Sequence, residues 1–512
     1  MGPCVRVLLG RYALYLLVSL LTRWLSLVVE ILDVDESAHA VGSWVLLGGG
    51  RLYTDFVDNK PPLLYAYYAL PQLLLGPGLR AVHLFTAVVT APLAALGASS
   101  VFRHDRRGVI AALLWLVYGA SFLAHDMLAA SADLVLLLPA SWAIAIAADE
   151  ARAARARPLF LSGLLLGLAT LVKHQAAFWL AVGWAASRPR AGDRDSAAVS
   201  RVCALVTGFV LPLVGTWIAF AATGGAHDLV YWLLWRNALY AATPAAEALG
   251  RASSYLLPWL IATAPLWWAW TRSRALLDPH RRCLIDGLIV LGLLPAFVGF
   301  RFFPHYFVPA GFALAVGAAP AVAGWLERPR ASRAGRVFLA ATLVIATGFA
   351  GLNAWLWLGG SGVYHEEDSV YRLVPERLAA DPCFPGSRLF VWGWAPIFYY
   401  EAGLRGARPA SRFVVLAQAG LTAYVPGRPA GNGPAPDESP VFAPAHWDLL
   451  MSDLERTRAT YILDTAPAGL YRWSRYPLSD YPRLESYIAE RYERLDDVSQ
   501  VRVYRRRGCA AR

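Results

Sequence analysis

Apolar residues in this 512-residue chain come in long blocks, and most blocks have the length of a helix that crosses a lipid bilayer. About 20 apolar residues span the ~30 Å hydrocarbon core of a membrane as a helix. Hydrophobic residues make up 57% of the chain and charged residues only 16%, whereas a soluble protein of this length needs far more polar surface. The sequence therefore predicts an α-helical polytopic membrane protein.

The blocks place about eleven membrane crossings along the chain. The first, Tyr12 to Leu32, follows a short basic start and has no small-residue cleavage site after it, so we expect a retained anchor. Segment 176–187 is short for a crossing, which leaves the count open. The predicted spans cover residues 12–32, 79–102, 109–125, 131–148, 158–173, 176–187, 202–222, 254–271, 283–300, 305–326 and 337–358.

Arginine clusters lie in short linkers between alternate spans. The net charge of +11 is therefore spread over these linkers and does not form a basic patch with interleaved aromatics, which disfavours a nucleic-acid partner. The positive-inside rule places these linkers and the amino terminus in the cytoplasm. The excess of arginine over lysine is typical of a GC-rich bacterial gene, so we expect a multi-pass protein of the bacterial plasma (inner) membrane. The linkers cover residues 103–107, 152–157, 188–201, 272–282 and 328–336.

With this topology, the loop after the first span, residues 33–78, faces the outside of the cell. It holds two short helix candidates, Ser37 to Leu47 and Pro62 to Leu75. The second has too few residues to span the bilayer, so we expect it to lie along the membrane surface. A proline suits the first turn of a helix, and the Gly-Pro-Gly run at 76–78 ends it.

The chain changes character near residue 359. We predict a transmembrane catalytic domain over 1–358 and an extracytoplasmic α/β domain over 359–512, with a Pro/Gly-rich loop at 427–439. A polar helix is expected at Ser479 to Arg491. The strand candidates are Arg388–Trp392, Arg412–Leu416, Thr460–Asp464 and Val501–Tyr504.

The five cysteines do not form a CxxC pair, which excludes a zinc ribbon. Cys383 and Cys509 both fall in the predicted outer domain. An oxidising compartment would permit a disulfide between them. Two unpaired thiols are an equally acceptable interpretation of the sequence.

Three carboxylates, Asp33, Asp35 and Glu36, stand within four residues at the start of the outer loop. Such a group is mutually repulsive unless a cation, a hydroxyl substrate or a role as a base requires it. The alternative is a helix cap, for which one carboxylate is enough. We therefore favour a functional role, with these three residues as the ligands if the protein holds a divalent cation.

Lys60 and Lys173 are the only lysines of the chain, and both map to the outer membrane face. Lys60 immediately precedes the helix candidate that begins at Pro62. A phosphate at that helix start would meet an ammonium group and free backbone N–H groups. The alternative is a lysine that snorkels to the lipid headgroups, a role that arginine would fill equally well.

Four further ionisable residues map to the same face. Asp126 ends the third predicted span, and Asp133 lies in a mostly apolar stretch, where burial requires a partner or a function. Arg301 and His305 stand in an aromatic turn between the ninth and tenth spans, suited to a phosphate and a sugar ring. A basic turn with interfacial aromatics is the alternative.

These motifs resemble the GT-C glycosyltransferase superfamily, and most of all the family 39 dolichyl-phosphate-mannose protein mannosyltransferases and the aminoarabinose transferases. The likeness covers residues 12 to about 358. It is carried by the pair Asp35-Glu36, the run Asp58-Asn59-Lys60-Pro61-Pro62-Leu63, and the turn from Arg301 to Tyr306. One departure is Asn59, because aminoarabinose transferases have a glutamate at that position.

The resemblance implies an inverting glycosyltransferase that uses a polyprenyl-phosphate sugar on the outer face of the plasma membrane. It makes Asp35 the catalytic carboxylate with Glu36 beside it, and Lys60 a ligand of the donor phosphate. It also places Asp133 or Asp126 at a second acidic position. The acceptor can be a glycan, a lipid or a protein. The rival interpretation is a transporter or flippase of lipid-linked sugars, which predicts charges near the middle of spans and matched, broken halves.

Overall fold

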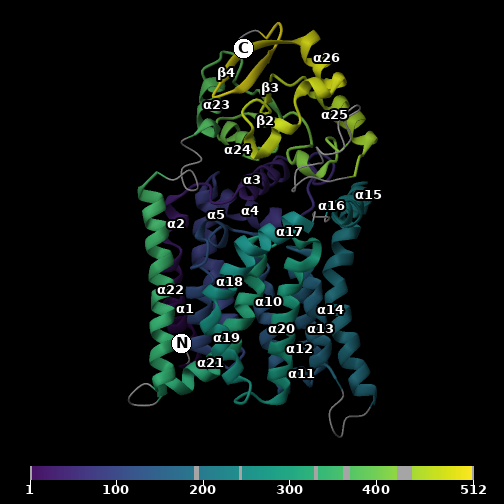
Figure 1. Cartoon of the computed structure of the whole chain (residues 1–512). Coiled ribbons are helices and arrows are strands. Elements are labelled where there is room, and N and C mark those ends of the chain that lie inside the picture. The colour runs from purple at the N-terminus through teal and green to yellow at the C-terminus, as the bar shows by residue number, and fades with distance from the viewer. Residues whose placement is uncertain are drawn as a thin grey trace.

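The computed structural model describes residues 3–188, 195–240, 245–327, 332–360, 369–423 and 441–509. The chain forms a long helical bundle with a smaller α/β domain at one end (Figure 1). The predicted fold class, a polytopic helical protein with a C-terminal α/β domain, is confirmed. The predicted loop at 427–439 and parts of the arginine linkers 188–201 and 328–336 lie outside the described residues.

Each predicted span lies mostly on helix, although residues 29–32 of the first and 119–123 of the third are not helical. The first begins earlier than expected and breaks at Arg23. The bundle consists of α1 (Pro3–Thr22), α2 (Trp24–Val28), α5 (Leu79–Phe85), η1 (Thr86–Thr90), α6 (Ala91–Ser100), α7 (Arg106–Tyr118), α8 (Ala124–Met127), α9 (Ala132–Val135), α10 (Leu137–Ala148), α11 (Glu150–Ala153), α12 (Ala156–Thr170), η2 (His174–Trp179), α13 (Leu180–Ala186), α14 (Asp195–Ala222), α15 (Ala226–Val230), η3 (Tyr231–Arg236), α16 (Asn237–Tyr240), α17 (Ala245–Arg251), η4 (Ala252–Leu256), α18 (Leu257–Ala262), α19 (Ala264–Ser273), α20 (Pro279–Phe297), η5 (Val298–Phe300), η6 (Pro304–Phe307), α21 (Val308–Glu327) and α22 (Arg333–Leu358).

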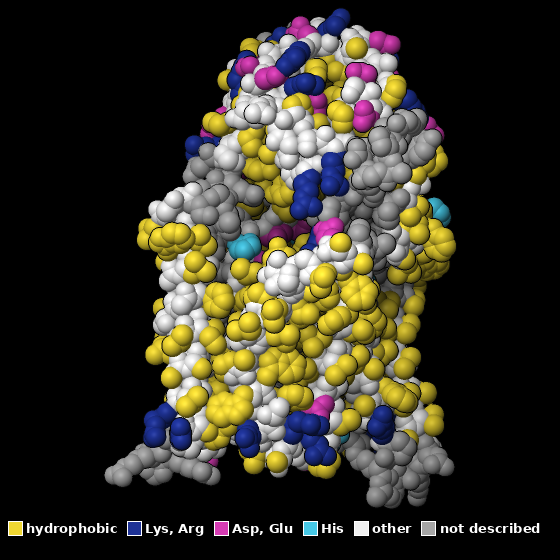
Figure 2. Space-filling view, in the orientation of Figure 1, with side chains coloured by type: hydrophobic (Ala, Val, Ile, Leu, Met, Phe, Trp, Pro, Cys, Tyr) yellow, Lys and Arg dark blue, Asp and Glu magenta, His cyan; other side chains and the backbone are white. Residues whose placement is uncertain are grey.

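Within the described residues, six helical segments are long and apolar enough to cross a membrane. Ala132–Ala148 and Ala156–Thr170 are apolar but shorter. The other predicted spans are helices that are shorter than a full crossing or interrupted, as at Thr263 between α18 and α19. On the face that Figure 2 shows, apolar side chains cover the bundle, and arginine side chains gather at the end opposite the α/β domain.

Two helices of the first loop, α3 (Val34–Leu47) and α4 (Pro62–Leu75), lie at the end of the bundle that faces the α/β domain (Figure 1). Helix α3 begins three residues before the prediction because the Asp33 carboxylate caps it, accepting from the Asp35 N–H at 2.8 Å. Helix α4 has the predicted bounds, and Gly76 caps its end.

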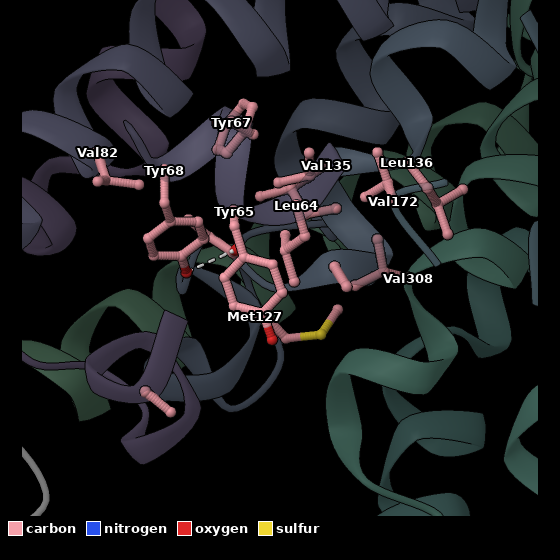
Figure 3. Packing of buried hydrophobic residues seen from close by; sticks show 14 of the residues in the cluster. Leu64, Tyr65, Tyr67, Tyr68, Val82, Met127, Val135, Leu136, Val172 and Val308 are labelled. Atoms are coloured by element: carbon pink, nitrogen blue, oxygen red, sulfur yellow. Dashed lines mark hydrogen bonds between the residues drawn. The ribbon is translucent and has the colours of Figure 1, made fainter. Parts of the chain in front are cut away.

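The face of α4 that carries Leu64, Tyr65 and Tyr68 is buried (Figure 3). These side chains pack among apolar residues from several bundle helices, including Val135 and Val308. Burial of each such large apolar side chain stabilises the fold by about 1.5–3 kcal/mol. Helix α4 is therefore firmly seated, and the loop residues just before it are held against the bundle.

The α/β domain is built on one five-stranded sheet with the order β2-β1-β3-β5-β4. The first three strands are parallel, and β5 is antiparallel to both β3 and β4. The strands are β1 (Arg388–Trp392), β2 (Arg408–Pro409), β3 (Tyr461–Asp464), β4 (Tyr492–Val498) and β5 (Val501–Arg506), and the helices are α23 (Val370–Ala379), α24 (Pro396–Leu404), α25 (Pro444–Thr457) and α26 (Pro482–Arg491).

The predicted strand Arg412–Leu416 is wrong, because this segment is not part of the sheet. The N–H group of Arg412 donates to the Asp453 carboxylate at 3.0 Å, and its C=O accepts from the Val57 N–H at 3.0 Å. The backbone of this segment is therefore used to dock the domain on the first loop. The other three predicted strands are confirmed within two residues, and β4 was not predicted because its sequence is mostly charged.

A second contact fixes the domain above α3. The Glu30 carboxylate accepts hydrogen bonds from the Tyr400 hydroxyl and from the Leu79 N–H, the latter at 3.0 Å, and pairs with Arg80 at 2.8 Å. The Tyr400 ring also stacks on Trp44 of α3, with centroids 5.3 Å apart. The domain thus rests on the helix that begins at the acidic cluster.

Cys383 and Cys509 form a disulfide that ties the two ends of the α/β domain together across 126 residues. Of the two possibilities that the sequence left open, the structure has the bonded one. We expect Cys383→Ser to lower the stability of the domain by about 2–5 kcal/mol, because the reduced chain gains conformational entropy when unfolded. Urea unfolding of the purified protein, followed with and without reductant, measures this. Equal midpoints for the oxidised and reduced protein would contradict it.

Candidate functional site

A hollow separates the bundle from the α/β domain, and acidic, basic and histidine side chains meet there (Figure 2). A pocket at the start of α3 contains most of the predicted site residues. Nine were named from the sequence, and all except Asp126 and Arg301 line this pocket. Its lining consists of Asp33, Asp35, Glu36, His39, Lys60, Ala129, Ser131, Ala132, Asp133, Lys173 and His305.

Asp35 and Lys60 face each other in this pocket, with Oδ2 and Nζ 3.6 Å apart. The Asp35 side chain is 38% exposed, so it is open to a substrate. Burial raises the pKa of Asp35, but the Lys60 ammonium, with smaller contributions from His39 and His305, outweighs burial and holds this pKa below its usual value. Asp35 is therefore ionised at neutral pH and can accept a proton.

The pKa of Asp33 is shifted in the opposite direction to that of Asp35. Burial raises the pKa of Asp33 well above its usual value, and the charges of Asp35 and Asp126 add to this effect. Its carboxylate also caps α3. The two carboxylates thus have opposite shifts, which is a common property of sites that carry out acid–base chemistry.

The Lys60 ammonium is held from its other side by Asn59, whose Oδ1 accepts its hydrogen bond at 3.2 Å. The Asn59 amide in turn donates to Asn237 of α16 at 3.1 Å, and Asn237 lies 3.1 Å from Nε2 of His174. This chain of hydrogen bonds connects the first loop to two distant segments. It fixes Lys60 at the edge of the pocket.

A second charged cluster forms the other part of the pocket. The Lys173 ammonium donates to Oδ2 of Asp133 and lies 4.0 Å from the centroid of the Tyr306 ring. His305 Nδ1 is 2.5 Å from Asp126 Oδ1, and its Nε2 is 3.9 Å from Asp133 Oδ2. Both candidates for the second acidic position therefore meet at His305.

Arg301 does not reach the pocket in this structure. Its side chain is buried, and its backbone C=O accepts a hydrogen bond from Arg251 at 3.4 Å. Its predicted contact with a donor phosphate stays a prediction.

Glu36 is fully engaged by its neighbours. Oε1 accepts from the Ala130 N–H at 2.6 Å and lies 2.9 Å from His83 Nε2, and Oε2 accepts from the Leu32 N–H at 3.3 Å. The side chain is 1% exposed. Glu36 thus joins α3, α5 and the segment before α9, and so sets the position of Asp35. A direct catalytic role for Glu36 stays a prediction.

We expect Glu36→Ala to destabilise the protein by about 3–5 kcal/mol, because it leaves His83 and two backbone N–H groups buried without their partner. Asp35→Ala is the matched control from the same turn. The Asp35–Lys60 pair is partly exposed, so its loss is expected to cost less than about 1 kcal/mol. Thermal unfolding of the purified variants measures both. Equal midpoints for the two variants would contradict this account of Glu36.

The sequence analysis did not identify His39, which lies one turn after Asp35 on α3 and so on the same helix face. The four-residue spacing between Asp35 and His39 could have identified it. The His39 ring is buried against Tyr65 and Tyr68, with centroids 6.1 and 5.3 Å away. Burial lowers the pKa of His39 to about 4, with Lys60 acting in the same direction, so the ring is neutral at neutral pH.

A divalent cation does not fit these residues as they stand. In the part of the chain that the structure describes, no group of three or more His, Cys, Asp or Glu side chains is arranged to hold a metal ion. The three carboxylates named for this role diverge, because Asp33 caps the helix and the Glu36 oxygens are taken by other groups.

Comparison with known proteins gives a match only at the level of structure. No family model and no curated protein matches the sequence. The crystal structure of ArnT from Cupriavidus metallidurans bound to undecaprenyl phosphate superposes with a TM-score of 0.58 and 14% identity, over 97% of this chain and 98% of that chain. The apo form of ArnT gives 0.58 and 15%, over 97% of each chain. The Archaeoglobus fulgidus oligosaccharyltransferase gives 0.48 and 15%, over 94% of this chain and 71% of that one.

The match to ArnT extends over both parts of the molecule, the helical bundle and the C-terminal α/β domain. This is the architecture that the apolar blocks and the change of character near residue 359 predicted. The chain therefore has the multi-span membrane fold of ArnT, with a C-terminal α/β domain.

Proposed function

We propose that this protein is an inverting glycosyltransferase, which moves a sugar from a polyprenyl-phosphate donor to an acceptor hydroxyl. The observation that carries the proposal is the pairing of an ionised, accessible Asp35 with Lys60 in a pocket at the end of a membrane bundle. A carboxylate and an ammonium side by side supply a base for the acceptor and a cation for the donor phosphate.

We propose a polyprenyl-phosphate donor because the pocket carries positive charge and lies at the end of the apolar bundle. Lys60, Lys173 and His305 line one pocket, and the bundle below them is apolar, as a lipid-linked phosphate requires. ArnT, which shares this fold, was crystallised with undecaprenyl phosphate. We assign Lys60 to the donor phosphate, with Lys173 and His305 supporting it and Asp133 or Asp126 at the second acidic position.

The proposed reaction is a single displacement. Asp35 accepts the proton of the acceptor hydroxyl, whose oxygen attacks the anomeric carbon from the side opposite the phosphate and inverts that centre. A polyprenyl phosphate is a good leaving group, so no general acid is required, and Lys60 stabilises the negative charge that develops on it.

The site is proposed to face the outside of a bacterial plasma membrane. The arginine clusters gather at the opposite end of the bundle, which the positive-inside rule places in the cytoplasm (Figure 2). The Cys383–Cys509 disulfide in the α/β domain also favours an oxidising compartment. In this proposal residues 1–358 form the catalytic domain and 359–512 the extracytoplasmic domain.

A panel of radiolabelled polyprenyl-phosphate sugars tests the proposal. Membranes that contain the wild-type protein receive each donor, and label is then counted in lipid, glycan and protein fractions. Transfer from one donor into one fraction supports the proposal and identifies the sugar and the acceptor. If no donor gives transfer, while labelled lipid crosses the bilayer of proteoliposomes, the protein is a flippase and the proposal is wrong.

A further inference from the structure

Two polar atoms of residues that line the candidate pocket have no hydrogen-bond partner in the described part of the chain. They are Nδ1 of His39 and Oδ1 of Asp133. Their side chains are 2% and 1% exposed. A buried polar group without a partner destabilises a fold, so a native protein keeps one where it has a use for it.

The two residues reach the pocket from different elements. His39 lies one turn after Asp35 on α3, and the rings of Tyr65 and Tyr68 hold its imidazole in place. Asp133 lies on α9, where Lys173 binds its other carboxylate oxygen. The orientation of each side chain is thus fixed without using the unpartnered atom.

The size and the chemistry of the pocket limit what can bind there. Its enclosed part has a volume of about 10 Å³, which has room for one group of the size of a water molecule, so a sugar ring or a phosphate would lie in the open hollow outside it. A carboxylate oxygen only accepts hydrogen bonds, so the group must be a donor. Lys60 and Lys173 line the same pocket and disfavour an ammonium group, which leaves a neutral donor, either a hydroxyl group of the substrate or a water molecule that such a hydroxyl would displace.

We infer that His39 and Asp133 form a subsite that binds a single hydroxyl group of the substrate beside Asp35. This inference rests on the proposed function and adds to it a specificity-determining residue, His39. The hydroxyl belongs either to the transferred sugar or to the acceptor, and the chemistry of recognition is the same for both. A hydrogen-bonding site of this kind strongly rejects a substrate that lacks the hydroxyl.

The first test measures stability. A subsite residue has no partner in the free protein, so His39→Phe is expected to raise the thermal midpoint, by about 2 °C or more. His83→Phe is the matched control, because His83 is a buried histidine of the same region whose Nε2 is paired with Glu36. The control is expected to lower the midpoint. If His39→Phe also lowers it, His39 is a packing residue and the inference is wrong.

The second test measures transfer from the donor that the panel identifies. His39→Phe is expected to lower kcat/KM about tenfold or more. His39→Asn and His39→Gln each keep one hydrogen-bonding position of the ring, and one of them is expected to restore part of the activity. Unchanged transfer by His39→Phe would overturn the inference, even if this variant is more stable than the wild type.

Deoxy substrates distinguish the source of the hydroxyl. With the wild type, one deoxy-sugar donor or one deoxy acceptor is expected to react more slowly than the normal substrate. With His39→Phe, that deoxy substrate and the normal substrate are expected to react at similar rates. If every deoxy substrate loses activity equally in both proteins, no hydroxyl binds at His39.

The outcome for this subsite can be separated from the outcome for the proposed function. If the wild type transfers no label, the proposed function fails, and the subsite is judged from ligand-induced stabilisation by the same polyprenyl-phosphate sugars. If the sugar raises the thermal midpoint of the wild type but not that of His39→Phe, the result would support the hydroxyl subsite. An equal shift in both proteins, or no shift in either, would remove it.

Discussion

Asp35→Asn is expected to lower the rate of sugar transfer by about 10²–10⁴-fold, the usual contribution of a general base. Asparagine has the shape of aspartate but cannot accept the proton of the acceptor hydroxyl. The wild-type carboxylate is ionised because Lys60 outweighs the effect of burial, so the loss is expected at every pH at which the wild type is active. Initial rates with saturating donor, measured at equal protein levels in membranes, give the ratio.

Asp55→Asn is a suitable control for this measurement. Asp55 is another carboxylate of the first loop, but it pairs with Arg51 at the surface and does not line the pocket. This variant is expected to transfer sugar at the wild-type rate. An Asp35→Asn protein that is as active as Asp55→Asn would show that Asp35 is not the base.

Lys60→Gln is expected to lower kcat/KM by about 10–100-fold, because a charged hydrogen bond to the donor phosphate is lost. It is also expected to change the pH profile. Lys60 is the largest influence that lowers the pKa of Asp35, so its removal raises that pKa. The base is active only above its pKa, and activity is lost as the pH falls through it. The acid limb of the kcat profile should therefore move to higher pH.

Lys60→Arg separates the two effects. Arginine keeps the positive charge next to Asp35, so the acid limb should stay near that of the wild type. The geometry at the phosphate changes, so KM for the donor should rise. A Lys60→Gln profile with an unshifted acid limb would contradict the coupling between Lys60 and Asp35.

Much of the fold could be predicted because it depends on local patterns. Long apolar blocks predicted the bundle, a proline and a Gly-Pro-Gly run predicted both ends of α4, and a short run of apolar residues predicted β1. The pocket could be predicted in part, because charged residues at one end of several spans lie at similar depth and therefore meet.

What could not be predicted depends on partners far away in the sequence. Arg412 lies in an apparent strand, but Asp453 and Val57 take up its backbone groups. Glu36 looks like a second catalytic acid, and only the contacts with His83 and the Ala130 N–H reveal its positioning role. The sequence does not show these contacts, because periodicity and propensity describe only near neighbours.

The most direct test of the account uses purified protein in proteoliposomes. These contain the radiolabelled polyprenyl-phosphate sugar that the panel identifies as the donor. They are supplied with an extract of the fraction that the panel identifies as the acceptor. The release of sugar from the donor and its appearance on the acceptor are followed for the wild type and for Asp35→Asn. The account predicts that the wild type moves label from donor to acceptor with inversion, and that Asp35→Asn moves it at least about 100-fold more slowly. Equal transfer by both proteins, or transfer with retention of configuration, would contradict it.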